Sequence, residues 1–273
     1  MTQTFRRPQV VAHRGASGAL AEHTLAAYQQ ALKDGAEALE CDVRLTADGH
    51  LVCVHDRRVE RTSDGVGVVS VLELAELDTF DFASWKTPWA DLDDEHPDPD
   101  PDPMAGKVLT LESLLALVRD SEKPVDMAIE TKHPTRYAGL VERRLVEVLA
   151  KFGWDRTAPG VHNPIRVMSF SWMSMRRVRE AAPGLPTVYL MKRVPLRFRD
   201  GSLPLGTKIV GVRLDIVRAH PEYVGRAHAR GNQVHVFTVN GRADVQWCLD
   251  LGVDALITDV PNRTLELVRQ YTS

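Results

Sequence analysis

The chain has 273 residues, of which 44% are hydrophobic and 26% are charged, and its formal net charge is -3. This composition is that of an ordinary globular protein, and the length suits one α/β barrel or two smaller domains. The small net charge gives no reason to expect nucleic acid or an anionic membrane as a partner. The three cysteines form no C-x-x-C pair, which favours a reducing compartment. We find no signal-peptide core and no apolar stretch long enough to span a membrane, and therefore expect a cytoplasmic protein.

Short apolar segments alternate with helical patterns from the start of the chain. Gln9–Ala12 predicts a first strand, and Leu25–Lys33 predicts a first helix that ends at Gly35. Ala38–Leu45 and Leu51–Val54 predict two more strands, with only five residues between them. That length is typical of a hairpin and too short for a crossover between parallel strands.

The rest of the chain repeats a pattern of a short strand followed by an amphipathic helix. Further strands are predicted at Val125–Glu130, Ile165–Phe170, Thr187–Met191, Ile209–Leu214, Val234–Val239 and Ala255–Ile257. Further helices are predicted at Thr110–Asp120, Tyr137–Phe152, Met173–Ala182, Glu222–Arg230, Arg242–Leu251 and Thr264–Gln270. Such a series, with no helix-only region, favours one parallel sheet with helices outside it.

The fold class that this pattern predicts is α/β, and we expect residues 1–273 to form a single (β/α)8 TIM-type barrel. The predicted strands number nine, one more than such a barrel needs, and the hairpin after Leu45 accounts for the surplus. A doubly wound open sheet is the alternative. No Gly-x-Gly-x-x-Gly turn follows the first strand to support a dinucleotide site in such a sheet.

The stretch Asp56–Lys107 interrupts the pattern after the third strand. It contains a helical segment near Val71–Leu77 and several aromatic residues, and it continues into the acidic, proline-rich run Asp91–Pro103. Repeated Asp-Pro dipeptides extend the backbone and hold the carboxylates apart, so we expect an exposed loop there and no metal site. We predict that residues 56–107 form a small insertion over the C-terminal face of the barrel.

Titratable residues recur where the predicted strands end, which is where a (β/α)8 barrel assembles its active site. Glu40 and Asp42 lie two residues apart on the second strand, so their carboxylates face the same side. Folding the hairpin about Ala47 and Asp48 brings His55 beside this pair. Two close carboxylates repel one another unless one is protonated or a cation bridges them.

Glu130, at the end of the next strand, offers a third carboxylate. Oxygen donors at neighbouring strand ends predict a site for a divalent cation, either Mg²⁺ or Ca²⁺, with Mn²⁺ as a further candidate. The alternative is an ion-paired surface ribbon that uses Arg44. Three acids and a histidine on adjacent strand ends favour the functional site over that alternative.

His13 and His55 lack the spacing of the common zinc sites and have no cysteine partner, which favours acid–base chemistry. An imidazole can take a proton from a nucleophile or give one to a leaving alkoxide. Arg14 and Lys132 add positive charge that suits a phosphoryl group. With a metal ion, these residues form a charge pattern that fits an anionic phosphodiester.

A series of short motifs runs along the chain, and its members are His13-Arg14-Gly15, Glu22-His23-Thr24, Gly35–Val43, Thr46–Gly49, Val54-His55-Asp56, Ile129–Lys132, Ser169-Phe170, Phe237–Asn240 and Ile257–Asp259. In this order the motifs resemble those of the glycerophosphodiester phosphodiesterase family over nearly the whole chain. The resemblance implies a (β/α)8 barrel with an insertion after the third strand. It also implies cleavage of a small-molecule glycerophosphodiester to glycerol 3-phosphate and an alcohol.

The resemblance further implies a role for each residue singled out above. The two histidines match the family's acid–base pair, the two basic residues match its phosphate contacts, and the three acids match its divalent-metal ligands. In that order these are His13 and His55, Arg14 and Lys132, and Glu40, Asp42 and Glu130.

The chain departs from the family pattern in two motifs. Ala21-Glu22-His23-Thr24 stands where the family usually has Pro-Glu-Asn-Thr. A titrating group near the site is one interpretation of His23, but we expect a surface or helix-capping histidine there. Phe237 stands where the family commonly has tryptophan, which keeps an apolar wall but lacks an indole N–H donor. Glu22, Ser169 and Phe237 are candidate pocket-lining residues, and Ser169 has no neighbouring base in sequence to make it a nucleophile. His235 is expected at a strand surface and is assigned no role.

Three functions remain open from the sequence. The first is metal-dependent hydrolysis of glycerophosphodiesters. The second is a related barrel phosphodiesterase that acts on lysophospholipids, in the manner of a lysophospholipase D, or on another phospholipid. The third is a non-catalytic phosphate-binding protein, and the presence of both histidines and all three acids argues against it. The head group, the metal, the oligomeric state and the separate roles of the histidines do not follow from the sequence.

Overall fold

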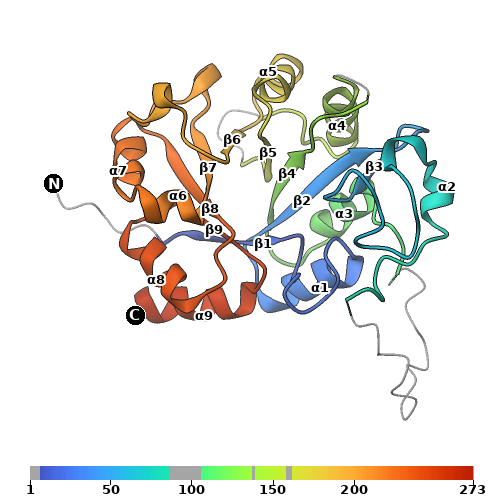
Figure 1. Cartoon of the computed structure of the whole chain (residues 1–273), viewed down its shortest axis with the longest axis horizontal. Coiled ribbons are helices and arrows are strands. Elements are labelled where there is room, and N and C mark those ends of the chain that lie inside the picture. Colours follow the sequence, from blue (N-terminus) through green and yellow to red (C-terminus); the bar gives the residue numbers. More distant parts are fainter. Residues whose placement is uncertain (1–6, 87–105, 137–138, 158–161, 273) are drawn as a thin grey trace, which may run out of the picture.

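The computed structural model describes residues 7–86, 106–136, 139–157 and 162–272. Its strands are β1 Gln9–His13, β2 Ala38–Leu45, β3 Leu51–Cys53, β4 Asp126–Thr131, β5 Ile165–Ser169, β6 Thr187–Met191, β7 Ile209–Arg213, β8 Gln233–Phe237 and β9 Ala255–Thr258. They form one sheet in the order β1-β9-β8-β7-β6-β5-β4-β2-β3, and a pairing of β1 with β2 closes it into a ring (Figure 1). Every pairing within the ring is parallel. The predicted (β/α)8 TIM-type barrel is therefore confirmed.

The ninth strand, β3, lies outside the ring. It pairs with β2 in antiparallel orientation, with Val43 opposite Cys53. The amide of Val54 continues this register by donating to the carbonyl oxygen of Asp42 over 3.1 Å. The surplus strand is thus the predicted hairpin, and it carries the chain from the ring to His55.

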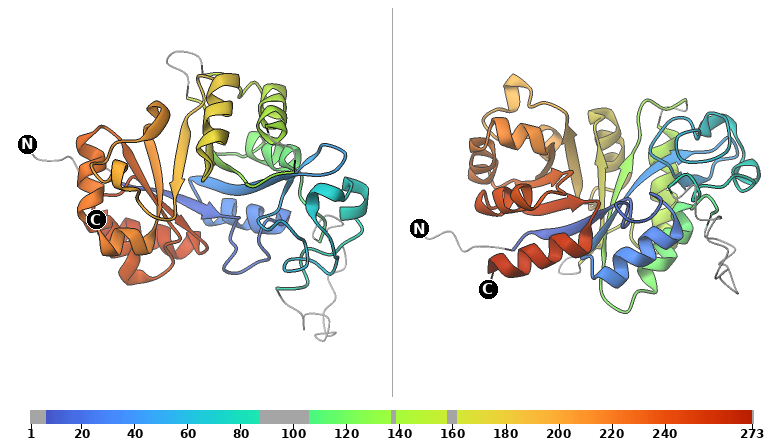
Figure 2. Two further views of the ribbon diagram at one scale, coloured as in Figure 1. Left: turned by 45° about the horizontal axis from the view of Figure 1, so that its top comes forward. Right: turned by 60° about the horizontal axis from the view of Figure 1, so that its bottom comes forward.

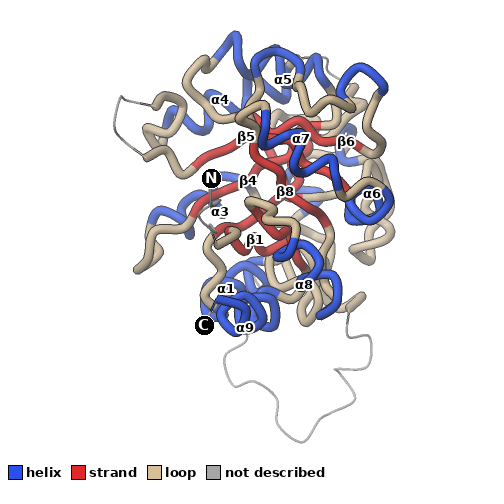
Figure 3. The backbone as a smooth tube through the Cα atoms, turned by 90° about the vertical axis from the view of Figure 1, so that its left-hand side faces the viewer, coloured by secondary structure: helices blue, strands red, loops and turns tan. Residues whose placement is uncertain are grey.

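Helices cover the outside of the ring, as Figures 2 and 3 show. The α-helices of the described residues are α1 Leu25–Asp34, α2 Leu74–Leu77, α3 Leu111–Arg119, α4 Leu140–Lys151, α5 Trp172–Ala181, α6 Leu214–Ala219, α7 Glu222–Ala229, α8 Arg242–Asp250 and α9 Pro261–Thr272, of which α2 belongs to the insertion. Most of them agree with the predicted spans to within a few residues. The exception is α6, a short helix directly after β7 that the sequence pattern did not predict.

Side-chain caps explain where the helices begin and end. Thr24 accepts a hydrogen bond from the amide of Ala27 at the start of α1, and Thr110 accepts one from Ser113 at the start of α3. Gly35 ends α1 in the left-handed conformation, with a φ of 88°, which glycine adopts without steric cost. These caps satisfy amide and carbonyl groups that a helix end leaves unpaired.

The core has a layer inside the ring and a layer between the ring and the helices. Val11, Met168 and Ile257 belong to the inner layer, whereas Leu39 packs in the outer one. His235 is only 3% exposed. The predicted surface position for His235 is wrong, because both faces of a strand are covered in a closed parallel barrel.

The insertion after β3 packs against the hairpin (Figure 1). Its described part contains a 3-10 helix, η1 Val69–Val71, and α2, and both fall near the predicted helical segment. Val69 and Phe82 join Val52 of β3 in a separate apolar cluster. The acidic run Asp91–Pro103 lies outside the described residues, and the placement of the whole insertion over the C-terminal face stays a prediction.

Within the described part of the chain, no helix has the length and apolar character needed to cross a membrane. Cys41, Cys53 and Cys248 are buried free thiols. Cys41 packs in the outer core layer, on the side of β2 that faces away from Glu40 and Asp42.

Candidate active site at the carboxyl ends of the barrel strands

The barrel places the ends of β1, β2 and β4 next to one another. Parallel pairing sets His13 of β1 beside Glu40 of β2. The same pairing sets Asp42 of β2 beside Glu130 of β4. Residues that are far apart in sequence therefore meet at the rim where a (β/α)8 barrel carries its chemistry.

Glu40, Asp42 and Glu130 form one acid cluster, in which a carboxylate oxygen of each residue lies within 4.8 Å of the others. All three side chains are buried. Burial and the charge of Asp42 raise the pKa of Glu130 to about 7, and they hold the pKa of Glu40 well above its usual value. The cluster therefore gains full negative charge only where positive charge compensates it.

Two basic side chains reach the acid cluster directly. Nζ of Lys132 lies 2.9 Å from Glu130 and 3.2 Å from Asp42, and Nε of Arg14 lies 3.0 Å from Asp42. Burial alone would raise the pKa of Asp42, but Lys132, a hydrogen bond to His23 and Arg14 hold it well below its usual range. Arg14 and Lys132 also line the pocket above the acids, as does Glu130.

The acid cluster fits a hard divalent cation. Mg²⁺ and Ca²⁺ bind carboxylate oxygens, and the cluster supplies three carboxylates within 4.8 Å of one another. Among the described residues, neither histidine nor cysteine belongs to it, so the donor set is not that of a zinc site. A cation here would also relieve the repulsion that raises the pKa values of Glu40 and Glu130.

The prediction for His23 is wrong, because His23 is neither at the surface nor the cap of α1. Its side chain is buried, and Nε2 lies 3.0 Å from Oδ2 of Asp42. Nδ1 lies 2.8 Å from the hydroxyl of Tyr28. The neighbouring Thr24 caps α1, and His23 itself has a φ of 64°, which turns its ring inward. His23 therefore holds the carboxylate of Asp42 in place through a buried hydrogen bond.

His13 forms a pair with Asp259. Nδ1 of His13 lies 2.6 Å from the Asp259 carboxylate. Asn240 donates to that carboxylate over 2.6 Å, and Ser17 donates over 3.0 Å. Burial opposes ionisation of Asp259, but these hydrogen bonds, that of His13 first, lower its pKa to about 2. An ionised carboxylate only accepts hydrogen bonds, so Nδ1 of His13 donates and the ring is held in one orientation.

His55 forms a second such pair, with Asp56. Nδ1 of His55 lies 2.7 Å from the Asp56 carboxylate. Arg44 also fixes this segment, since its Nε and Nη2 atoms donate to the carbonyl oxygen of His55 over 3.0 and 2.8 Å. Burial lowers the pKa of His55 to about 4, and Arg14 and Lys132 act in the same direction. The ring is therefore neutral near pH 7, with Nδ1 donating to Asp56 and Nε2 able to accept a proton.

An ion-pair network links the two sides of the site. Glu22 accepts hydrogen bonds from Arg14 over 2.9 Å and from Arg61 over 2.7 and 2.9 Å. Arg61 also pairs with Asp56, the partner of His55. Burial opposes ionisation of Glu22, but Arg61 and Arg14 lower its pKa to about 2. Because Arg61 belongs to the insertion, the insertion helps to position the His55 pair.

A pocket of about 700 Å³, which we call the reaction pocket, opens above these residues. His13, His55 and Glu130 line it, and so do Phe170 and Phe237, whose rings meet edge to face with centroids 6.0 Å apart. The remaining side chains on its wall are mostly basic, namely Arg14, Arg44, Arg57, Lys132, His133, Lys192, Arg213 and Arg218. The arrangement suits an anionic ligand that has an apolar part.

Of the three candidate pocket-lining residues, only Phe237 is among those that line this pocket. Ser169 is fully buried and donates to the carbonyl oxygen of Thr131 over 3.1 Å. Glu22 lies behind Arg14 in the ion-pair network. The described hydrogen bonds of Ser169 go to the backbone and not to either histidine, so Ser169 is not placed as an activated nucleophile.

Residue-by-residue reasoning missed the partners of the histidines. Asp56 follows His55 directly, and Asp259 follows the last strand directly, so both were visible as acids near strand ends. Their pairing with the imidazoles depends on side-chain direction, which the sequence pattern does not give. No sequence pattern indicated a role for Arg61, because it lies in a segment without hydrophobic periodicity.

Comparison with known proteins agrees with this geometry. The sequence matches the glycerophosphoryl diester phosphodiesterase family over residues 13–263. It is 44% identical over 257 residues to the Mycobacterium tuberculosis protein named "Probable glycerophosphodiester phosphodiesterase 1", covering 94% of this chain and 91% of that one. It is 33% identical over 265 residues to the glycerophosphodiester phosphodiesterase of Bacillus subtilis, covering 96% and 86% of the two chains.

Solved structures show the same fold. An Oleispira antarctica phosphodiesterase in complex with the product sn-glycerol-3-phosphate superposes with a TM-score of 0.80 at 24% identity, covering 96% of this chain and 97% of that one. A glycerophosphodiester phosphodiesterase of Thermotoga maritima gives a TM-score of 0.70 at 20% identity, with coverage of 96% and 99%. The family match extends over almost the whole barrel, from His13 past Asp259. The chain therefore belongs to the glycerophosphoryl diester phosphodiesterase family of enzymes.

Proposed function

We propose that this enzyme hydrolyses glycerophosphodiesters to glycerol 3-phosphate and an alcohol, with a divalent cation held by Glu40, Asp42 and Glu130. One observation carries the proposal. Two imidazoles, each held by a carboxylate at Nδ1, face the same basic pocket that opens onto the acid cluster. A phosphodiester needs compensation of its negative charge and two proton transfers, and this pocket offers both.

The metal would bind at the acid cluster and supply Lewis-acid polarisation of a phosphoryl oxygen. Arg14 and Lys132 line the pocket beside the acids, and they are suited to bind the other phosphoryl oxygens. They also hold Asp42 ionised, so it remains a ligand at low pH. The oxygen donors favour Mg²⁺ or Ca²⁺, with Mn²⁺ as a third choice.

His13 and His55 would move the protons. Asp259 and Asp56 fix the two rings so that Nε2 of each is the atom available to the substrate. His55 is neutral near pH 7 and can accept a proton. One ring takes a proton from the attacking hydroxyl or water, and the other gives one to the leaving alcohol oxygen. Phe170 and Phe237 form an apolar wall against which the carbon atoms of the glycerol would pack.

The test is a panel of metals and substrates with identification of the products. Glycerophosphocholine should yield glycerol 3-phosphate and choline when Mg²⁺, Ca²⁺ or Mn²⁺ is added to enzyme treated with EDTA. Full activity in the metal-free enzyme would remove the cation from the reaction. Turnover of lysophosphatidylcholine alone would favour the lysophospholipase D-like function, and binding without turnover under every condition would favour a binding protein.

We also propose a cytoplasmic location. Cys41, Cys53 and Cys248 are free and buried, which suits a reducing compartment. Cell fractionation with an antibody against the chain tests this, and recovery only outside the cytoplasm would contradict it.

A further inference from the structure

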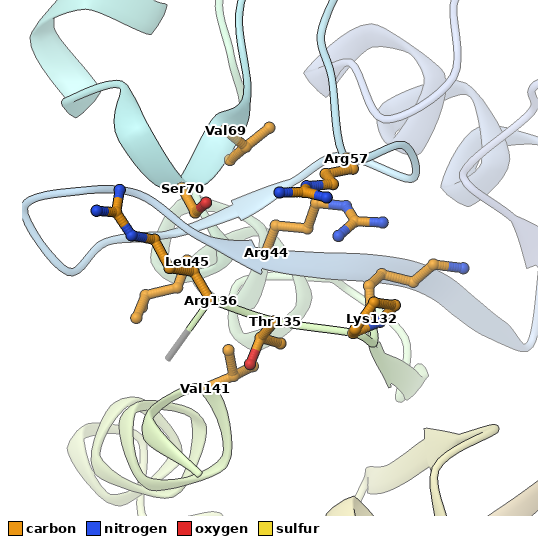
Figure 4. A pocket seen from close by; sticks show the side chains of 10 residues that line it. Arg44, Leu45, Arg57, Val69, Ser70, Lys132, Thr135, Arg136 and Val141 are labelled. Carbon is orange, nitrogen blue, oxygen red and sulfur yellow. The ribbon is translucent and has the colours of Figure 1, made fainter. Parts of the chain in front are cut away.

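A second cavity, of about 160 Å³, adjoins the reaction pocket on the side of the β2–β3 hairpin and the insertion (Figure 4). We call it the cationic cleft. Its walls are Arg44, Leu45, Arg57, Val69, Ser70, Lys132, Pro134, Thr135, Arg136 and Val141. Arg44, Arg57 and Lys132 also line the reaction pocket, so the two cavities share a wall.

The described lining of the cationic cleft is basic. Four basic side chains line it and no carboxylate does, and Figure 4 shows Arg44 and Arg57 together, with Lys132 on one side and Arg136 on the other. Burial lowers the pKa of Arg44, the nearby acids Asp42, Asp56 and Glu130 oppose this, and Arg57 is near enough to lower it further. The guanidinium of Arg57 makes no ion pair with any residue that the structure describes. An anionic ligand in the cleft would therefore compensate the charge of Arg57.

The cleft also has the size and the chemistry for a phosphate group. A cavity of about 160 Å³ has room for several water molecules, and therefore for a phosphate. Planar guanidinium groups match phosphate oxygens in pairs, and Ser70 and Thr135 add hydroxyl groups. Leu45 and Val141 add apolar side chains to its wall.

The position of the cleft indicates which part of a substrate enters it. Lys132 contacts the acid cluster and lines both cavities, so the cleft begins next to the place proposed for the reacting phosphorus. Phe170 and Phe237, proposed for the glycerol, come from the ends of β5 and β8. The cleft borders β2 instead, so we assign it to the leaving alcohol.

We propose that the cationic cleft binds a second phosphate group, a monoester carried by the leaving alcohol. This inference rests on the proposed function and names its substrate class: glycerophosphodiesters whose head group is itself phosphorylated. The head group would bind through Arg57 and Arg136 while the diester phosphorus stays beside the acid cluster.

A matched pair of substrates tests this. Glycerophosphoglycerol and the same diester with a phosphate monoester on its leaving glycerol differ only in the second anionic group. We expect kcat/KM to be about 10- to 100-fold higher for the phosphorylated substrate at low salt, as expected from one charge-assisted hydrogen bond. Raising the ionic strength should reduce this ratio, because the cleft is open to solvent.

Arg136→Glu is the variant of choice, since Arg136 is exposed and lines only the cationic cleft. It should bring the ratio close to one and leave kcat/KM for glycerophosphoglycerol within about twofold. Arg58→Glu is the matched control, because Arg58 is exposed, pairs with Glu60 and lines neither cavity. It should keep the wild-type ratio.

A ratio near one in the wild-type enzyme, or an unchanged ratio in Arg136→Glu, overturns the inference while the proposed function stands. If inorganic phosphate changes turnover of glycerophosphoglycerol in the wild type only, and the ratio is one, the cleft binds a free anion and the substrate assignment is wrong. If neither diester is hydrolysed with any metal, the proposed function fails, and this inference fails with it.

Discussion

Nε2 of His23 lies 3.0 Å from Oδ2 of Asp42, and both residues are buried. His23 has no place on the wall of the reaction pocket. Its hydrogen bond instead fixes the orientation of a carboxylate that we propose as a metal ligand, and such outer contacts tune metal affinity.

We therefore expect His23→Ala to weaken Mg²⁺ or Mn²⁺ binding about 10- to 100-fold. Isothermal titration calorimetry measures this directly. His50→Ala is the control, since His50 is half exposed and pairs with Asp48 at the hairpin turn. Equal metal affinity in the wild type and His23→Ala would show that His23 has a packing role only.

Metal binding should depend on pH through Glu130. Its pKa is raised to about 7, and a metal ligand must lose its proton, so protons compete with the metal as the pH falls below 7. We expect affinity to fall by at least about tenfold per pH unit below 7, because the pKa of Glu40 is raised as well. Glu130 is partly protonated near pH 6.5 in the metal-free enzyme, so proton release should accompany binding there. An affinity that stays constant from pH 6 to pH 8 would contradict this.

Loss of either imidazole should lower kcat by about 10²- to 10⁴-fold. His13→Ala and His55→Ala should both fold, because both side chains lie partly exposed at the rim. Asp56→Asn should have a smaller effect on kcat, since it keeps the ring in place but offers Nδ1 of His55 an amide. Near wild-type turnover in either alanine variant would remove that histidine from the reaction.

Arg61→Ala tests whether Arg61 positions His55 or stabilises the fold. The side chain is 44% exposed, so its ion pairs with Glu22 and Asp56 should add little to the free energy of unfolding. Release of Asp56 should nevertheless misorient His55, and we expect kcat to fall about tenfold with KM nearly unchanged. Arg58→Ala removes a neighbouring ion pair and should change neither. A rise in KM alone would mean that Arg61 acts on substrate binding instead.

Ser169→Ala should lower the stability of the fold and leave turnover nearly unchanged. Ser169 is fully buried and donates to Thr131, and its oxygen accepts from the amide of Ser171. Removing the hydroxyl should lower the free energy of unfolding by about 1–2 kcal/mol, because these backbone groups lose their partner. Turnover per folded molecule should stay within a few-fold of wild type. A loss comparable to that of the histidine variants would require a chemical role for Ser169.

The barrel could be predicted from the sequence because the same strand–helix pattern recurs along the whole chain. Strands and helices alternate along the chain, and the short link after Leu45 identified the one antiparallel strand. The acid cluster also followed, since Glu40 and Asp42 share a face by strand geometry and the adjacent β4 brings Glu130 to Asp42.

The direction of individual side chains could not be predicted from the sequence. His23 lies one residue before the cap of α1, where an exposed histidine is the ordinary expectation, but a positive φ turns it into the core. His235 alternates on a strand as a surface residue would, but the ring has no exposed face. Such positions are decided by contacts between distant segments, which periodicity does not record.

The antiparallel strand β3 has a consequence for how the enzyme can diversify. The proposed metal ligands lie on β2 and β4, inside a ring whose register is fixed on both sides. Arg57 lies beyond β3, on a segment that the ring does not need in order to close. Replacement of Arg57 would change the group proposed to meet the leaving alcohol and would leave the proposed metal ligands in place. We therefore expect that head-group preference can change by substitution at this position without loss of the proposed metal site.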